Sequence, residues 1–250
     1  MTYCLGMLLD AGLVMIADTR TNAGVDNIYS YRKLHTLANE PGRQVFAATA
    51  GNLSVSQSVI SLLQEGLPPE GGAEGEAPPR TLREAPSMFR AAQLVGDALR
   101  IANRTIGEAL AAANISGGST LLLGGRIGDG PPRLFQVYEA GNFIECKSEL
   151  PFFQIGETKY GRPILDLIVR RTTPLAEAVK VGFLSFESSM RSNLAVGRPL
   201  DLIVMPADPA APLITRRVES DDPYFTDLSV RWSDMLRDAT DAVPDPPFLN

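Results

Sequence analysis

The chain has 250 residues, of which 44% are hydrophobic and 21% are charged, and its net charge is -6 at pH 7. This is the composition of an ordinary globular protein, and the acidic balance argues against a nucleic-acid partner, because neutralising phosphates takes clustered lysines and arginines. No apolar run reaches the ~18 residues that a membrane span needs. The first ten residues lack a basic stretch and carry Asp10, unlike a secretion signal, so we expect a cytoplasmic protein.

The sequence lacks most of the common machinery of enzymes. His35 is the single histidine, which excludes a metal site built from several histidines. Any Ser-His-Asp triad would have to use His35 as its histidine. No G-x-S-x-G, H-E-x-x-H, C-x-x-C, Walker A or G-x-G-x-x-G motif occurs. We therefore expect no metal ion and no cofactor. Cys4 and Cys146 lie in apolar strand-like segments and are expected to be buried free thiols rather than a disulfide.

The first part of the chain reads as four strands and a helix. Residues 2–9 and 13–18 are apolar runs joined by Asp-Ala-Gly, which predicts a hairpin. Residues 31–37 and 44–50 are the third and fourth strand candidates. Residues 52–65 have apolar side chains at helical spacing, and Asn52 stands where a helix cap is expected.

A Pro-, Gly- and Glu-rich segment, residues 67–86, predicts a mobile surface insertion rather than a domain boundary. Helical spacing resumes after it, with Ser87 as the expected cap. The elements that follow in chain order are a helix at 87–114, strands at 119–126, 134–139, 143–147 and 152–156, helices at 162–170 and 174–192, strands at 200–205 and 213–218, and an amphipathic helix at 222–243.

The order of these elements favours an α+β fold, in which strands, two helices, strands, two helices and strands follow one another. Two stacked, mostly antiparallel sheets flanked by helix pairs form a four-layer αββα sandwich, and sheets covered on both faces explain the near-continuous apolar runs. A Rossmann-like fold would need strict alternation of strands and helices. We expect one domain over residues 1–218, followed by a C-terminal helical extension and tail, 219–250.

Short segments at the strand ends resemble a known family. Residues 15–20 (MIADTR) end the second strand, residues 31–34 (YRKL) open the third, and residues 48–51 (ATAG) end the fourth. This pattern is similar to that of proteasome β-subunits and the HslV-type bacterial peptidase. Within that group, residues 1–27 and 152–165 resemble the bacterial Anbu (ancestral β-subunit) family. The similarity extends from residue 2 to about 206 and implies the N-terminal nucleophile hydrolase fold.

The resemblance implies a threonine-type peptidase in which Thr2 is the nucleophile. Met1 would first be removed, by a methionine aminopeptidase or autocatalytically. A threonine hydroxyl needs a base, and the freed α-amine of the same residue has an ordinary pKa of ~7.7–8.0, close to working pH. Lys33 would favour the alkoxide and Asp18 would hold Lys33 in place and charged. Gly51 would supply a backbone N–H for the oxyanion.

Further positions match supporting residues of the family more loosely. They are Glu157, Ser189 and Ser192, and a salt bridge or a helix cap is the alternative role for each.

The resemblance also implies how a peptide binds: as an added strand between the loop after Asp18 and the segment at Gly51. The backbones of Asn22 and Gly51 would then lie beside it. The side chains expected to line the first specificity pocket are Thr21, Tyr31, His35, Thr49 and Leu53. For His35, a purely structural role is an equal alternative.

Finally, the resemblance implies a homo-oligomer arranged as a ring or a ring-like particle, and it leaves open whether an ATP-driven unfoldase takes part. Two other functions stay open. One is an N-terminal nucleophile amidohydrolase that uses the same Thr2 chemistry on a specialised small amide. The other is a non-catalytic scaffold of the same fold.

Overall fold

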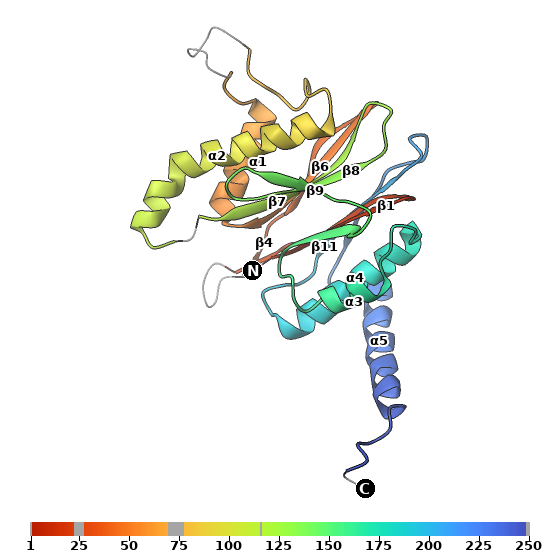
Figure 1. Cartoon of the computed structure of the whole chain (residues 1–250). Coiled ribbons are helices and arrows are strands. Elements are labelled where there is room, and N and C mark those ends of the chain that lie inside the picture. Colours follow the sequence, from red (N-terminus) through yellow and green to blue (C-terminus); the bar gives the residue numbers. More distant parts are fainter. Residues whose placement is uncertain (1, 23–27, 70–77, 116, 249–250) are drawn as a thin grey trace.

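A computed structural model describes residues 2–22, 28–69, 78–115 and 117–248 of the protein. Two five-stranded antiparallel sheets are stacked against each other, and helices cover the outer face of each (Figure 1). The expected αββα sandwich is therefore confirmed. A small two-stranded hairpin and a last helix, α5, stand beside this frame.

The first sheet has the strand order β10-β1-β2-β11-β12, with the predicted hairpin of β1 and β2 at its centre. Every residue of these two strands is buried, because the second sheet covers one face and α3 and α4 cover the other. The elements of this half are β1 (Tyr3–Leu9), β2 (Gly12–Asp18), β10 (Phe152–Gly156), β11 (Leu200–Pro206), β12 (Ile214–Val218), α3 (Arg162–Ile168) and α4 (Leu175–Ser192).

The second sheet has the order β5-β6-β7-β8-β9, and its outer face packs against α1 and α2. The side chain of Asn52 accepts hydrogen bonds from the N–H groups of Ser54 and Val55, and that of Ser87 accepts one from Arg90, so both predicted caps are confirmed. The elements of this half are β5 (Leu34–Glu40), β6 (Arg43–Gly51), β7 (Ser119–Ile127), β8 (Arg133–Val137), β9 (Phe143–Glu145), α1 (Leu53–Glu65) and α2 (Met88–Ala112).

The core is divided among the layers. One apolar cluster fills the space between the sheets, and two others lie between each sheet and its helices. Both cysteines are free and buried, as predicted. Within the described residues, no helix has the length and apolar character needed to cross a membrane.

The ends of the expected insertion are packed rather than loose. Leu67 and Arg80 exchange two backbone hydrogen bonds, of 2.9 and 2.8 Å, and Leu67, Leu82 and Ala85 are buried against α1 and α2. Residues 70–77, the middle of the segment for which we expect mobility, lie outside the described residues.

The connection between the sheets differs from the sequence expectation. The strand expected at 31–37 begins only at Leu34, and β3 (Arg20–Asn22) and β4 (Ile28–Ser30) form a hairpin that was not predicted. The physical reason is that Tyr31 bonds away from β6: its N–H donates to the Thr19 carbonyl at 2.8 Å. The contact of this segment with β6 begins only at Lys33, whose carbonyl accepts the Thr49 N–H at 2.9 Å.

The C-terminal helix α5 (Pro223–Asp241) begins at Asp222, whose carboxylate accepts a 2.9 Å hydrogen bond from Phe225 N–H. Its first turns pack on α4, and its far half projects away from the sheets (Figure 1).

Candidate active site

Asp18 and Lys33 form a buried ion pair at one end of the sandwich. Asp18 is the last residue of β2, and Lys33 immediately precedes β5. Lys33 Nζ donates to Asp18 Oδ1 at 2.8 Å and to the Arg20 carbonyl at 2.5 Å. Burial raises the pKa of Asp18, and the adjacent Lys33 ammonium opposes this effect. Since buried charges are tolerated only when paired, each side chain requires the other.

Asp18 also holds the beginning of β1. The same oxygen, Oδ1, accepts the Tyr3 N–H at 2.9 Å, and Oδ2 accepts the Gly197 N–H at 3.4 Å. One carboxylate oxygen thus joins the Lys33 ammonium to the peptide group between Thr2 and Tyr3. The aspartate and the lysine are brought together with the first residues of β1, although they stand far apart in the sequence.

Thr2 is buried and its backbone is fixed on both sides. Its carbonyl accepts the Glu157 N–H at 2.6 Å, and the next amide is held by Asp18. Gly156 makes this approach possible: its φ is +81°, and a Cβ there would lie 2.0 Å from the Thr2 carbonyl oxygen. Met1 lies outside the described residues, so its removal stays a prediction.

Gly51 ends β6 beside this cluster. Its φ is +113°, and a Cβ would lie 2.2 Å from the Gly118 carbonyl oxygen, so the position requires glycine. Two residues earlier, Thr49 N–H donates to the Lys33 carbonyl, which ties the end of β6 to the segment that carries the lysine.

Glu157 and Asn193 form a second polar layer around Thr2. Glu157 Oε1 accepts the Lys159 N–H at 2.8 Å, and Oε2 accepts Asn193 Nδ2 at 2.9 Å. Burial raises the pKa of Glu157, but these hydrogen bonds outweigh it and leave the pKa below its ordinary value. Sequence reasoning missed Asn193. The available signal was its position as a polar residue at the end of the helix that contains Ser189 and Ser192.

The two serines lie in other surroundings. Ser189 is fully buried and its hydroxyl donates to the Ser185 carbonyl at 2.9 Å, within α4. Ser192 is exposed at the last position of the same helix. Among the hydrogen bonds of the described residues, none joins either hydroxyl to Thr2, Asp18 or Lys33.

The residues expected at the specificity pocket come from four elements. Thr49 is buried in β6, Leu53 begins α1, Thr21 and Asn22 end β3, and His35 is half-buried in β5. Tyr31 is exposed, and its ring lies 6.2 Å from that of Tyr29. Burial lowers the pKa of His35, and the Arg32 charge lowers it further. The Thr21 hydroxyl is buried and makes no hydrogen bond to the described residues.

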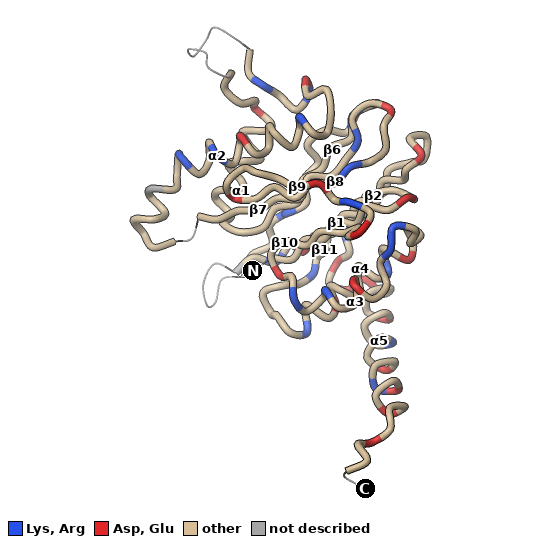
Figure 2. The backbone as a smooth tube through the Cα atoms, in the orientation of Figure 1, with Lys and Arg blue, Asp and Glu red and all other residues tan. Residues whose placement is uncertain are grey.

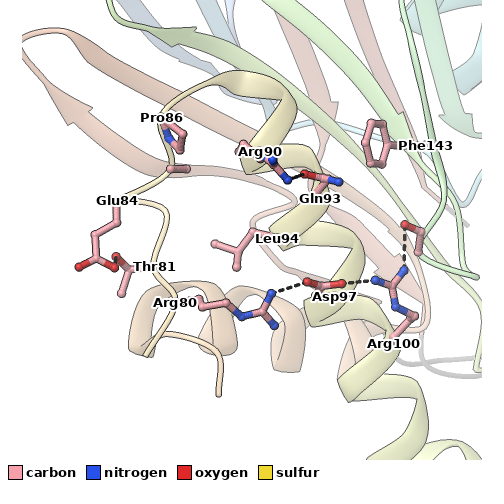
Figure 3. Close-up of a pocket in the computed structure, with 12 residues that line it drawn as sticks. Arg80, Thr81, Glu84, Pro86, Arg90, Gln93, Leu94, Asp97, Arg100 and Phe143 are labelled. Carbon is pink, nitrogen blue, oxygen red and sulfur yellow. Dashed lines mark hydrogen bonds and ion pairs between the residues drawn. The ribbon is translucent and has the colours of Figure 1, made fainter. Parts of the chain in front are cut away.

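A separate cavity of about 500 Å³ lies on the helical side of the second sheet. Figure 3 shows Asp97 of α2 there between two guanidinium groups, those of Arg80 and Arg100. None of the candidate catalytic residues lines it.

No family model matches the chain, and no curated protein matches it. Solved structures do. Anbu from Hyphomicrobium sp. strain MC1 is 45% identical, with a TM-score of 0.85 over 98% of this chain and 99% of that one. A helical assembly of the Anbu complex from Pseudomonas aeruginosa is 41% identical, with a TM-score of 0.88 and 98% of both chains covered. Anbu (ancestral beta-subunit) from Yersinia bercovieri is 38% identical, with a TM-score of 0.85 and the same coverage.

The chain belongs to the Anbu family. The resemblance inferred from the strand ends is thus confirmed, and so is the sandwich fold of this proteasome-like family. Because each match covers 98% of this chain, it extends into α5.

Proposed function

We propose that this Anbu protein is a cytoplasmic threonine-type peptidase whose nucleophile is Thr2, freed by removal of Met1. The observation that carries the proposal is that one oxygen of Asp18 accepts two hydrogen bonds, one from the Lys33 ammonium and one from the backbone N–H of Tyr3, the residue after Thr2. A buried ammonium held close to the start of β1 suits the activation of the Thr2 hydroxyl.

In the proposed reaction, the neutral α-amine of Thr2 takes the hydroxyl proton as the oxygen attacks the peptide carbonyl carbon. The Lys33 charge favours negative charge on the attacking oxygen, and the Gly51 N–H stabilises the oxyanion of the tetrahedral intermediate. When the C–N bond breaks, the α-ammonium returns its proton to the leaving amine. Water then hydrolyses the ester on Thr2, with the α-amine again acting as the base.

Asp18, Glu157 and Asn193 are positioning residues in this proposal. Asp18 keeps Lys33 charged and in place. Glu157 fixes the Thr2 carbonyl through its backbone, and its side chain is held in turn by Asn193. The proposal gives Ser189 and Ser192 no part in the reaction, since the Ser189 hydroxyl donates within α4 and Ser192 is exposed at the end of that helix.

For the substrate, we propose an extended peptide added as a strand between the backbones of Asn22 and Gly51. The side chains proposed for the first pocket are Thr21, Tyr31, His35, Thr49 and Leu53.

We also propose that the chain assembles with copies of itself. From the sequence we expect a ring or a ring-like particle; the relative from Pseudomonas aeruginosa forms a helical assembly, which favours an open helical arrangement over a closed ring.

The test is mass analysis of the protein before and after incubation with a peptide epoxyketone. We expect the purified protein to have lost Met1 and to gain one adduct, on Thr2. Thr2→Ala should gain none, whereas Thr105→Ala, altered at an exposed threonine of α2, should react like the wild type.

Retention of Met1, or an adduct on Thr2→Ala, would overturn the proposal. Hydrolysis of small amides without hydrolysis of fluorogenic peptides would show that the substrate class is wrong. Absence of both the adduct and any hydrolysis would identify a scaffold.

A further inference from the structure

A polar cavity of about 380 Å³ lies where the end of α4, the segment before β11 and the first turns of α5 meet. Its volume is within the range of small-molecule sites, about 300–1,000 Å³. Three arginines from separate parts of the chain line it: Arg20 of β3, Arg191 of α4 and Arg198 before β11. Among the described residues that line the cavity, Glu187 is the single acid. The cavity therefore has an excess of positive charge.

Two of these arginines lack the acid partner that other arginines of the protein have. Along α5, basic and acidic residues alternate (Figure 2), and both arginines of this helix pair with its aspartates. In the cavity, Arg191 follows this pattern, because its Nε donates to Glu187 at 2.5 Å. Among the ion pairs of the described residues, none includes Arg20 or Arg198. Two positive charges are thus left without a counter-charge.

The guanidinium of Arg198 also lacks a hydrogen-bond acceptor. Its carbon lies 5.0 Å from the centre of the Phe225 ring, a favourable contact for a cation. Its Nη1 is buried and has no hydrogen-bond partner among the described residues. A buried charged donor without an acceptor is costly, so a ligand that brings acceptors to this cavity would be favoured.

The guanidinium of Arg20 packs directly on the backbone of Gly197. A Cβ at Gly197 would lie 2.4 Å from the guanidinium carbon, so a side chain there would displace Arg20. The Nη1 of Arg20 donates to the Leu194 carbonyl at 3.0 Å, which holds the guanidinium at the wall of the cavity.

The chemistry of the lining favours a phosphate group. Guanidinium groups bind carboxylates and phosphates through paired N–H donors. A carboxylate presents two oxygens in one plane, whereas a phosphate presents oxygens in several directions and can meet arginines from separate segments. The hydroxyl-bearing residues Ser220, Thr226 and Ser229 line the same cavity.

The backbone beside both unpaired arginines holds the candidate catalytic pair. The Arg20 carbonyl accepts the Lys33 ammonium at 2.5 Å. The N–H of Gly197, the residue before Arg198, donates to Asp18 Oδ2 at 3.4 Å. A ligand that fixes the two guanidiniums would therefore also fix the backbone groups that contact the lysine and the aspartate.

We infer that this cavity binds a phosphate-bearing small molecule, and that the bound ligand speeds the reaction of Thr2 by fixing the Asp18–Lys33 pair. The binding is independent of the Thr2 chemistry, whereas the effect on the rate rests on the proposed function.

The test of binding is isothermal titration calorimetry of the full-length protein with inorganic pyrophosphate, at an ionic strength held constant with sodium chloride. Arg198→Met and Arg20→Met each remove one unpaired guanidinium. We expect each variant to bind pyrophosphate about ten-fold more weakly than the wild type. Arg237→Met is the matched control, because it removes an arginine of α5 that does not line the cavity, and it should bind like the wild type.

Citrate, which carries carboxylates only, is the competing ligand and should bind more weakly than pyrophosphate. Citrate binding as tight as that of pyrophosphate would overturn the assignment to phosphate. Absence of pyrophosphate binding, or wild-type affinity in a folded Arg198→Met or Arg20→Met, would overturn the site. Circular dichroism shows whether each variant is folded, and if one is not, the other decides.

The rate of epoxyketone adduct formation on Thr2 tests the second part. Saturating pyrophosphate should raise this rate about five-fold in the wild type and leave it unchanged in Arg198→Met. Binding without a change in rate would overturn the coupling to the catalytic pair. Absence of any adduct, with and without pyrophosphate, would instead overturn the proposed Thr2 chemistry, while the calorimetry would still decide the binding site.

Discussion

The Asp18 cluster and the far half of α5 depart from the usual distribution of residues in opposite directions. Around Asp18, charged side chains are buried and every carboxylate oxygen accepts hydrogen bonds. Along the far half of α5, apolar side chains are exposed: Met235 is 59% and Leu236 49% exposed. Buried polar groups and exposed apolar groups are the informative exceptions to the rule that apolar residues lie inside.

The two exceptions differ in what completes them. The Asp18 cluster is complete within one chain, because strand ends from both sheets supply its partners. The exposed apolar residues of α5, by contrast, lie outside the buried clusters of the core. Mutations should therefore have large effects on stability in the first region and small effects in the second.

The largest effect is expected from Asp18→Asn. This change leaves the buried Lys33 ammonium without its counter-charge, which should cost about 3–5 kcal/mol in the free energy of unfolding. It should also slow adduct formation on Thr2 on the order of 100-fold, since the lysine loses its position. Urea unfolding and the epoxyketone reaction measure the two effects.

The matched control is Asp227→Asn, which removes an exposed partner of Arg231. An exposed pair contributes under about 1 kcal/mol, so this variant should unfold nearly like the wild type. Equal losses in the two variants would mean that burial does not distinguish the two regions.

An intermediate effect is expected from Gly51→Ala. The new Cβ would meet the Gly118 carbonyl at 2.2 Å, in a conformation with φ of +113° that alanine rarely adopts. Gly42→Ala separates the steric clash from the backbone strain, because Gly42 has φ of +76° but no atom within 4 Å of the added Cβ. We expect Gly51→Ala to lose about 2 kcal/mol more than Gly42→Ala by thermal or urea unfolding. Equal losses of stability in the two variants would show that the end of β6 shifts to make room for the Cβ at no cost in free energy.

The smallest effect is expected from the titration of His35. Burial and the Arg32 charge lower its pKa, so the unfolded chain binds this proton more readily than the folded one. Above the ordinary pKa of ~6.5, His35 is neutral in both states and should not reduce the free energy of unfolding. As the pH falls below that value, the unfolded chain takes up the proton first, and the free energy of unfolding should decrease.

His35→Gln should remove that part of the pH dependence of unfolding. As His35 is the only histidine, a single imidazole NMR signal reports its titration directly. A midpoint above 6.5 would contradict the assignment.

Sequence patterns predicted most of the frame, because its strands and helices are marked by strong apolar periodicity and by caps. The β1–β2 hairpin and the helix starts at Asn52 and Ser87 follow from local signals alone. The small hairpin β3–β4 could not be found in this way, because Arg20–Asn22 is polar and short. The start of β5 was misplaced because the Tyr31 N–H bonds to the Thr19 carbonyl and not to β6, a contact that the local pattern does not show.

The candidate site was only partly accessible from the sequence. Thr2, Asp18, Lys33 and Gly51 lie at strand ends whose local patterns resemble the family. The role of Gly156 depends on the approach of β10 to Thr2, a contact between residues that are distant in the chain. The link from Glu157 to Asn193 depends in the same way on where α4 ends. Such contacts follow from the packing of elements, which periodicity does not specify.

The bridge between Leu67 and Arg80 has a practical consequence. Its two hydrogen bonds join the ends of this segment, so we expect the helices on either side to keep their packing whatever the length of the chain between the two residues. Doubling the length of a closed loop costs only about 0.6 kcal/mol in chain entropy. A fluorescent reporter or an affinity tag can therefore be inserted between these two residues and leave both the Thr2 end of the sandwich and α5 untouched.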